Sequence, residues 1–152
     1  MAILSLPYPT PGLATRILAR DPFHLVLPKD WPDDHFMREL TFWPDSSILL
    51  LEKEHCLTRD ALAACHIKDQ KKIHPFHASS LHTLVQMVNK GLGLTFLPQL
   101  AINSGILHST NLSVKAIHGQ PNAYREIGIA WRPTSKKLDS YGLFADLIVY
   151  FR

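Results

Sequence analysis

The chain has 152 residues, of which 46% are hydrophobic and 19% are charged, and its formal net charge is +3. This composition is that of a folded domain with a real core, and it argues against a disordered chain or a coiled coil. The basic residues are scattered rather than gathered in the stripe typical of a nucleic-acid-binding module, and no apolar run reaches the roughly 18 residues that span a bilayer.

Three strands are predicted in the first third of the chain. Residues 2–6 form a short apolar strand that a proline-rich stretch ends, and residues 23–27 form a second strand. Residues 47–52 are a continuous apolar run typical of a buried strand in a parallel sheet. The polar and aromatic stretch before it contains at most one helical turn, near residues 36–40. Because domains seldom begin on a buried strand, we expect further structure before residue 1.

Two helices are predicted in the middle of the chain. The first has Thr58 as its expected N-cap and runs through an alanine-rich stretch to Cys65. The second begins after Ser79 or Ser80, either of which can cap it, and Gly91 ends it. Its apolar residues follow the i, i+3, i+4, i+7 spacing of a buried helix face: Leu81, Leu84, Val85 and Val88.

Strands and helices continue to alternate towards the end of the chain. Residues 73–76 are a short strand, and residues 92–98 form a strand that leads directly into a short helix. Two more strands are expected at residues 112–117 and 126–131, and an amphipathic helix at residues 138–150. This alternation predicts an α/β domain with a mainly parallel sheet. It gives a structural class and no function.

The chain has two cysteines, Cys56 and Cys65, whose chemistry can be considered from the residues alone. Cys56 lies just before the predicted helix start, where unpaired backbone N–H groups and the helix dipole favour a thiolate, and His55 and Arg59 would add positive potential. Such a thiolate attacks peroxide and becomes a sulfenic acid, which a second thiol converts to a disulfide. Composition alone favours the other interpretation, that both cysteines are buried and inert.

Other cysteine chemistries fit this spacing poorly. His55-Cys56 and Cys65-His66 offer four zinc ligands, but Cys-x8-Cys is not a zinc-finger spacing and adjacent side chains diverge, so we expect no metal site. A thioredoxin-like enzyme would need Cys-x-x-Cys, which the sequence lacks. The opening residues do not resemble a signal peptide. We therefore expect a cytoplasmic protein, in which a disulfide is transient, catalytic or sensory.

Several stretches resemble a known family. Residues 79–98, Ser-Ser-Leu-His-Thr-Leu-Val-Gln-Met-Val-Asn-Lys-Gly-Leu-Gly-Leu-Thr-Phe-Leu-Pro, resemble the capped helix, Gly-x-Gly turn and Leu-Pro strand of LysR-type effector domains. Within that group, residues 49–57 (Leu-Leu-Leu-Glu-Lys-Glu-His-Cys-Leu), Cys65 and residues 130–135 (Ala-Trp-Arg-Pro-Thr-Ser) resemble the OxyR peroxide sensors. The Gly-x-Gly follows a helix and opens a strand, the reverse of the order in a dinucleotide-binding motif.

The resemblance implies the periplasmic-binding-protein-like (type 2), two-lobed α/β fold. It assigns residues 1–30 to a remnant of the first regulatory lobe and its crossover. Residues 31–152 would be a complete second lobe whose C-terminal helix returns towards the first. The first lobe would be truncated, and the DNA-binding helix-turn-helix of the family would be absent from this chain.

The same resemblance implies a hydrogen peroxide-sensing regulatory domain of a LysR-type activator of oxidative-stress genes. It makes Cys56 and Cys65 a reversible disulfide switch, with His55 and Arg132 supporting the bound peroxide. It implies neither enzyme activity nor a cofactor. The implied partners are hydrogen peroxide, further copies of the chain in a dimer or tetramer, and DNA through the absent segment, with no membrane.

Two other functions stay open. The first is a LysR-type effector domain that binds a small anion while the cysteines are inert. Ser79 and Ser80 would then be ligand contacts, although helix capping is the more common role of serines at such positions. The second is a thiol peroxidase, an enzyme that turns over. Arg132 has an alternative interpretation as well, that of a surface charge after a strand.

Overall fold

The computed structural model describes residues 1–31, 43–53, 55–117, 120, 122–135, 140–143 and 145–146. The chain divides into two units, one formed by Met1–Asp21 with Arg125–Arg152 and the other by Pro22–Tyr124. The helical turn expected at residues 36–40 lies outside the described residues. Of the predicted terminal helix, residues 140–143 and 145–146 are helical, and the remainder lies outside the described residues.

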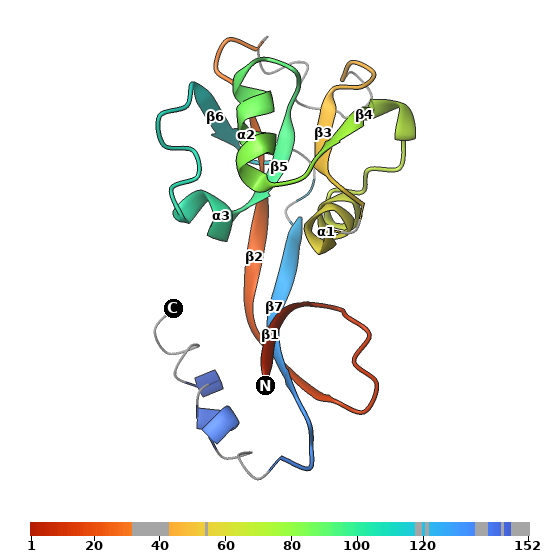
Figure 1. Cartoon of the computed structure of the whole chain (residues 1–152), viewed down its shortest axis with the longest axis vertical. Helices are drawn as coiled ribbons and strands as arrows, with labels where there is room; N and C mark the ends of the chain where they lie inside the picture. Colours follow the sequence, from red (N-terminus) through yellow and green to blue (C-terminus); the bar gives the residue numbers. More distant parts are fainter. Residues whose placement is uncertain are drawn as a thin grey trace. The chain divides into compact units, whose positions relative to one another are not determined.

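The first unit is built on strands (Figure 1). β1 (Ala2–Leu6) forms where the sequence predicts it and pairs antiparallel with β7 (Tyr124–Trp131) along its whole length. β7 also neighbours β2 (Ala14–Pro28), which begins well before the predicted residues 23–27. The first half of β2 was not predicted, because polar and charged residues interrupt its apolar ones and most of its side chains are exposed. Its sheet neighbours and the burial of Leu18 against Ile129 give it a reason to be extended.

A buried ion pair joins two strands of the first unit. Asp21 of β2 is only 2% exposed; Arg125 Nε of β7 donates to its Oδ2 atom at 3.0 Å, and Arg125 Nη2 lies 2.9 Å from the same oxygen in an ion pair. A carboxylate is tolerated in such a place only when it is paired, because burial removes its hydration. The guanidinium supplies that pairing with two donors of fixed geometry.

The second unit contains a parallel strand pair, further strands added to β2, and the helices. β3 (Ile48–Leu51) is wholly buried and pairs parallel with β4 (Ile73–Ala78), as its apolar run predicts. β5 (Thr95–Pro98) and β6 (Leu112–Lys115) both pair antiparallel with β2. The helical segments are α1 (Cys56–Ala64), the short 3-10 helix η2 (Gln70–Lys72), α2 (Leu81–Asn89) and α3 (Gln99–Asn103).

The expectation of a mainly parallel sheet is wrong. The pair β3–β4 is parallel, but β1–β7, β2–β5 and β2–β6 are antiparallel. Alternating strands and helices predicted a series of parallel crossovers. Instead, β5 and β6 pair with β2 in the antiparallel direction, and both strands lie far from β2 in the sequence. Such long-range pairing leaves no mark in the local hydrophobic pattern.

α2 forms as the sequence predicts. Ser80 precedes it in an extended conformation, and its Oγ accepts a hydrogen bond from the backbone N–H of Thr83 at 3.2 Å, which is an N-cap interaction. Gly91 follows the helix with φ +77°, in the left-handed region that ends many helices. The buried face of α2 consists of Leu84, Val85 and Val88.

Gly93 lies where two backbone segments approach closely. A Cβ added at Gly93 would overlap the carbonyl oxygen of Ser47, which accepts a hydrogen bond from the Leu94 N–H at 2.9 Å. We expect Gly93→Ala to lower the free energy of unfolding by about 1–3 kcal/mol, as measured by urea denaturation. Gly142→Ala is the control, because an added Cβ there meets nothing within 4 Å. An equal loss in both variants would contradict this account of Gly93.

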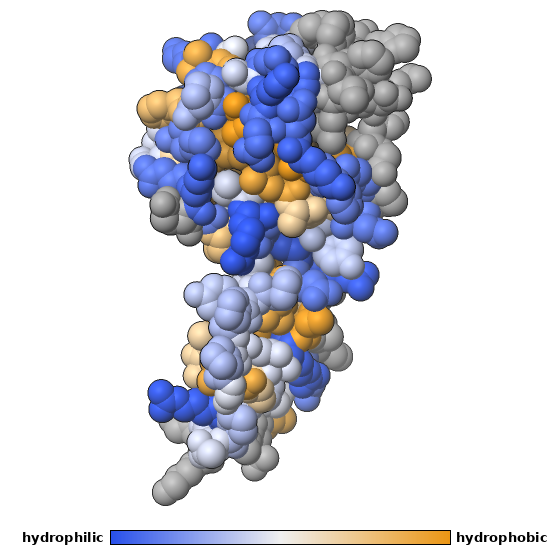
Figure 2. Space-filling model, turned by 90° about the vertical axis from the view of Figure 1, so that its right-hand side faces the viewer, coloured by the Kyte–Doolittle hydropathy of each residue, from blue (hydrophilic) through white to orange (hydrophobic). Residues whose placement is uncertain are grey.

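The surface of the second unit mixes polar and apolar side chains. Figure 2 views the molecule from the side on which β4 and α1 lie in Figure 1, and apolar residues there are framed by hydrophilic ones. Exposed apolar side chains of this unit include Phe76, Leu92 and Leu100. Within the part of the chain that the structure describes, no helix combines the length and apolar character needed to cross a bilayer.

Candidate functional site

The candidate site is built on α1, which begins at Cys56. His55 is its N-cap, with an extended backbone and no side-chain hydrogen bond to the helix. The expectation that Thr58 caps the helix is wrong, because Thr58 is the third helical residue and its buried hydroxyl donates to the carbonyl of Leu51 at 3.0 Å. Cys56 is therefore the first helical residue rather than the one before the helix, among the backbone N–H groups that lack a partner one turn back.

The bond from Thr58 also fixes the start of α1 in the fold. Leu51 is the last residue of β3, so the hydroxyl ties the first turn of the helix to the end of a buried strand. Leu57 and Ala61 are buried beside Thr58 and form the inner face of the helix. Cys56 precedes this face and is exposed.

The two cysteines lie in opposite environments. Both are free thiols; Cys56 is exposed and Cys65 is buried, with no exposed surface. Burial raises the pKa of Cys65 from 9.0 to about 12, because the thiolate would lose its hydration. Cys65 is consequently a neutral thiol at physiological pH and is shielded from dissolved oxidants. Cys56 is the thiol that such an oxidant reaches first.

The helix keeps the two cysteines apart. Cys56 is its first residue and Cys65 is its C-cap, so the whole interval between them is helical. At about 1.5 Å per residue, the two Cα atoms are separated by roughly 13 Å. A disulfide tolerates a Cα separation of at most about 7 Å. A bond between Cys56 and Cys65 therefore requires α1 to unwind at least in part.

The C-terminal end of α1 is a Schellman turn. The backbone N–H of Ile67 donates to the carbonyl of Leu62 at 3.0 Å, and that of His66 donates to the carbonyl of Ala63 at 3.3 Å. Gln120 adds a side-chain contact, because its Nε2 donates to the carbonyl of Cys65 at 2.8 Å. Gln120 was not predicted from the sequence. A glutamine so far along the chain carries no local signal of the carbonyl that it binds.

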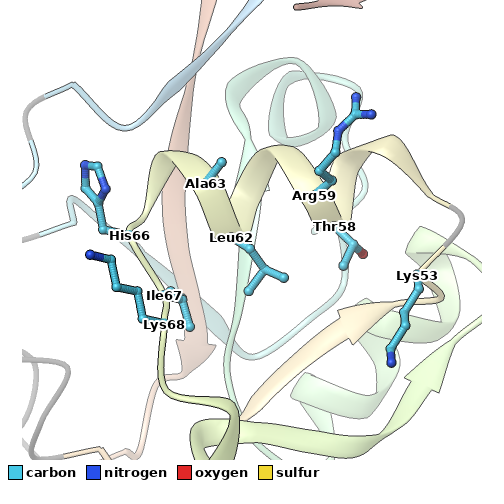
Figure 3. Close-up of a pocket in the computed structure, with 8 residues that line it drawn as sticks. All are labelled: Lys53, Thr58, Arg59, Leu62, Ala63, His66, Ile67 and Lys68. Atoms are coloured by element: carbon cyan, nitrogen blue, oxygen red, sulfur yellow. The ribbon is translucent and has the colours of Figure 1, made fainter. Parts of the chain in front are cut away.

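A surface depression of about 570 Å³ lies beside α1. In Figure 3, the Leu62 side chain points from one side of the helix, whereas Arg59 and Ala63 project from the other. Leu62, Ile67 and the stem of Lys68 give the depression an apolar part, and its lining includes four basic residues: Lys53, Arg59, His66 and Lys68. The depression therefore joins an apolar floor to a basic rim on this side of α1.

The structure brings some of the predicted site residues together. His55 is exposed and adjoins Cys56 at the start of α1. Ser80 caps α2, and Ser79 is exposed before it. Arg132 is exposed and follows β7 in the first unit, so its support of peroxide stays a prediction. Among the described residues, no group of three or more His, Cys, Asp or Glu side chains is placed to hold a metal ion.

The raised pKa of Cys65 predicts a loss of stability at alkaline pH. Below pH 9.0, Cys65 is protonated in the folded and the unfolded chain. Between pH 9.0 and about 12, the unfolded chain releases this proton and the folded chain keeps it, so the free energy of unfolding falls with a slope that approaches about 1.4 kcal/mol per pH unit well above pH 9.0. We expect urea denaturation of Cys56→Ser to show a loss of about 1 kcal/mol from this cause between pH 9 and 10. The double variant Cys56→Ser, Cys65→Ser should lack it, and identical slopes would contradict the assignment.

Comparison with known proteins identifies the family. The model of the LysR substrate binding domain matches residues 1–149. The HTH-type transcriptional regulator EstR of Acinetobacter baylyi is 34% identical over 149 residues, which are 97% of this chain and 49% of that protein. A probable hydrogen peroxide-inducible genes activator of Mycobacterium avium is also 34% identical over 149 residues, 97% of this chain and 47% of that protein. The chain spans about half the length of these curated relatives.

A solved structure agrees with this match. The reduced form of the regulatory domain of OxyR2 from Vibrio vulnificus is 43% identical, with a TM-score of 0.87, and the match covers 99% of this chain and 70% of that one. The periplasmic-binding-protein-like α/β fold that the sequence resemblance implied is thereby confirmed. By its sequence and its fold, this chain belongs to the LysR family of transcription regulators, as a substrate-binding domain.

Proposed function

We propose that the chain is the peroxide-sensing part of a LysR-type transcriptional activator of oxidative-stress genes, and that it switches through a reversible Cys56–Cys65 disulfide. The observation that carries the proposal is one helix with an exposed thiol at its first residue and a buried thiol at its C-cap. The relatives named as peroxide-inducible activators and the OxyR2 regulatory domain support it. The domain is a sensor, with no cofactor and no catalytic turnover.

The proposed chemistry takes place in two balanced steps. The Cys56 thiolate attacks one peroxide oxygen, the O–O bond breaks, and after protonation of the leaving hydroxide the products are Cys56–SOH and water. The Cys65 thiol then attacks the sulfenic sulfur, which forms the S–S bond and releases a second water. Two thiols thereby supply the two electrons that reduce one peroxide. His55, which adjoins Cys56, is proposed to donate a hydrogen bond to the peroxide and the departing hydroxide.

The wider assignments follow from the family. Residues 1–30 are proposed to belong to the first regulatory lobe and its crossover, and residues 31–152 to the second lobe, with a C-terminal helix that returns towards the first. The grouping of Arg125–Arg152 with Met1–Asp21 is in keeping with that return. The cytoplasm is the proposed location, and a dimer or tetramer the proposed assembly. Contact with DNA is assigned to a helix-turn-helix outside this chain, in keeping with the relative named an HTH-type regulator.

Mass spectrometry after one equivalent of hydrogen peroxide tests the proposal. An internal Cys56–Cys65 disulfide at stoichiometric peroxide supports it. Absence of oxidation would leave the LysR-type alternative, a domain that binds a small anion while its cysteines stay inert. Sustained consumption of peroxide in the presence of a thiol reductant would instead identify a thiol peroxidase. Either of the last two results overturns the proposal.

Operator binding gives a further expected result. Since the proposed DNA contact lies outside this chain, we expect no sequence-dependent shift of operator DNA when this chain is titrated in a gel assay. Weak retardation that disappears as salt is raised would reflect only its positive net charge of +3. A sequence-dependent shift that resists salt would contradict the assignment.

A further inference from the structure

The ends of α1, α2 and α3 differ in one respect. Gly91 follows α2 with φ +77°, and Gly105 follows α3 with φ +81°. The corresponding residue after α1 is His66, with φ +51°. Only glycine enters the left-handed region without a steric cost, since it has no Cβ. The helix that carries the cysteines therefore ends on a strained residue, whereas the other two end on glycine.

The strain at His66 is held by backbone contacts and not by its side chain. The Schellman hydrogen bonds from His66 and Ile67 require the left-handed conformation, and Ile67 is buried. The bond from Gln120 to the Cys65 carbonyl fixes the preceding residue. Among the described residues, the exposed imidazole of His66 has no hydrogen-bond or ionic partner, so no side-chain contact offsets the energetic cost of its left-handed backbone. A residue keeps a strained backbone conformation when several neighbouring contacts hold it there, as these do.

The strained residue adjoins the thiol that must leave its place. Cys65 is the C-cap and His66 follows it directly. A disulfide between Cys56 and Cys65 needs the helix between them to unwind, because the roughly 13 Å between their Cα atoms exceeds what a disulfide spans. Unwinding the last turn breaks the Schellman hydrogen bonds, and His66 is then free to return to an ordinary conformation.

We propose that His66 is a positioning residue that sets the oxidation threshold of the Cys56–Cys65 pair. It raises the free energy of the reduced, helical state and not that of the oxidised, unwound state, so it favours the disulfide. This inference rests on the proposed function and deepens it. Replacing His66 by glycine removes the strain from the reduced state and makes the pair harder to oxidise.

The test is a redox titration in glutathione buffers. Oxidised glutathione and the dithiol give the Cys56–Cys65 disulfide and two molecules of reduced glutathione, so the equilibrium constant is measured directly. We expect His66→Gly to lower this constant about five-fold, equivalent to about 20 mV in the reduction potential of a two-electron couple. His66→Ala keeps a Cβ in the left-handed region and removes the imidazole, so it should match the wild type.

Gly91→Ala separates an effect on the switch from an effect on the fold. An added Cβ at Gly91 meets nothing within 4 Å, so this variant introduces the same kind of backbone strain at the end of α2. It should lower the melting temperature and leave the reduction potential unchanged. An unchanged potential in His66→Gly, or an equal shift in His66→Ala, overturns the role of His66. Absence of any Cys56–Cys65 disulfide in the wild type would instead overturn the proposed function.

Discussion

In the Cys65→Ser variant, we expect one equivalent of hydrogen peroxide to produce a sulfenic acid on Cys56 that dimedone traps. In the Cys56→Ser variant, we expect no trapped product at all. The difference follows from accessibility: Cys56 is exposed at the first residue of α1, whereas Cys65 is wholly buried. Burial also keeps Cys65 protonated, since its pKa is raised to about 12, and a thiol is a poor nucleophile towards peroxide.

The single-cysteine variants distinguish attack from resolution. Cys65→Ser removes the resolving thiol, so the sulfenic acid persists for trapping and no internal disulfide forms. Mass spectrometry of proteolytic fragments locates the label. The assigned roles would be reversed if Cys65 in the Cys56→Ser variant were labelled as fast as Cys56 in the Cys65→Ser variant. A control in the same Cys65→Ser background is His82→Ala, which changes an exposed side chain of α2 and should leave the trapping of Cys56 intact.

Oxidation should loosen α1 and leave α2 nearly unchanged. On formation of the Cys56–Cys65 disulfide, we expect backbone amide exchange between residues 55 and 67 to rise by at least about ten-fold, which corresponds to about 1.4 kcal/mol in opening free energy. The reason is geometric, because a nine-residue helix whose ends are joined by a disulfide cannot keep its hydrogen bonds. Hydrogen–deuterium exchange followed by mass spectrometry measures the change.

α2 serves as the internal reference for this measurement. It is capped by Ser80, ended by Gly91 and buried through Leu84, Val85 and Val88, and it contains neither cysteine. Its amides should therefore exchange at similar rates in both redox states. Unchanged exchange in α1 despite a mapped disulfide would mean that the two thiols are neighbours before oxidation. A rise of equal size in both helices would indicate global loosening rather than a local switch.

Local sequence signals predicted the elements that depend on local causes. α2 was predicted from its serine cap, its apolar spacing and its closing glycine, because these act within a few residues. β3 was predicted from a continuous apolar run, since a strand buried on both faces needs one. The candidate cysteines were found from their own chemistry and from the family resemblance, and the structure shows which of them is exposed.

Features that depend on distant partners were not predicted. The antiparallel pairing of β2 with β5 and β6 joins segments far apart in the chain. Thr58 was expected to cap α1 because threonine favours that role, but its hydroxyl donates to the carbonyl of Leu51, and the N-cap is His55, three residues earlier. Gln120 reaches the carbonyl of Cys65 across a long stretch of sequence. Periodicity and local propensity contain no information on such contacts.

Burial of Cys65 separates the proposed response into an early step at Cys56 and a later step that forms the disulfide. Attack on peroxide at the exposed Cys56 proceeds at a rate that depends on peroxide concentration, whereas closure of the disulfide must wait until the end of α1 opens. At high peroxide, closure should therefore reach a plateau rate set by the opening of the helix alone. A reductant that reaches the sulfenic acid before that opening returns the domain to its starting state. A brief exposure to oxidant would thus end before the disulfide forms, whereas a sustained exposure would produce it. Because Cys65 is buried, the proposed sensor would respond to the duration of oxidant exposure as well as to its concentration.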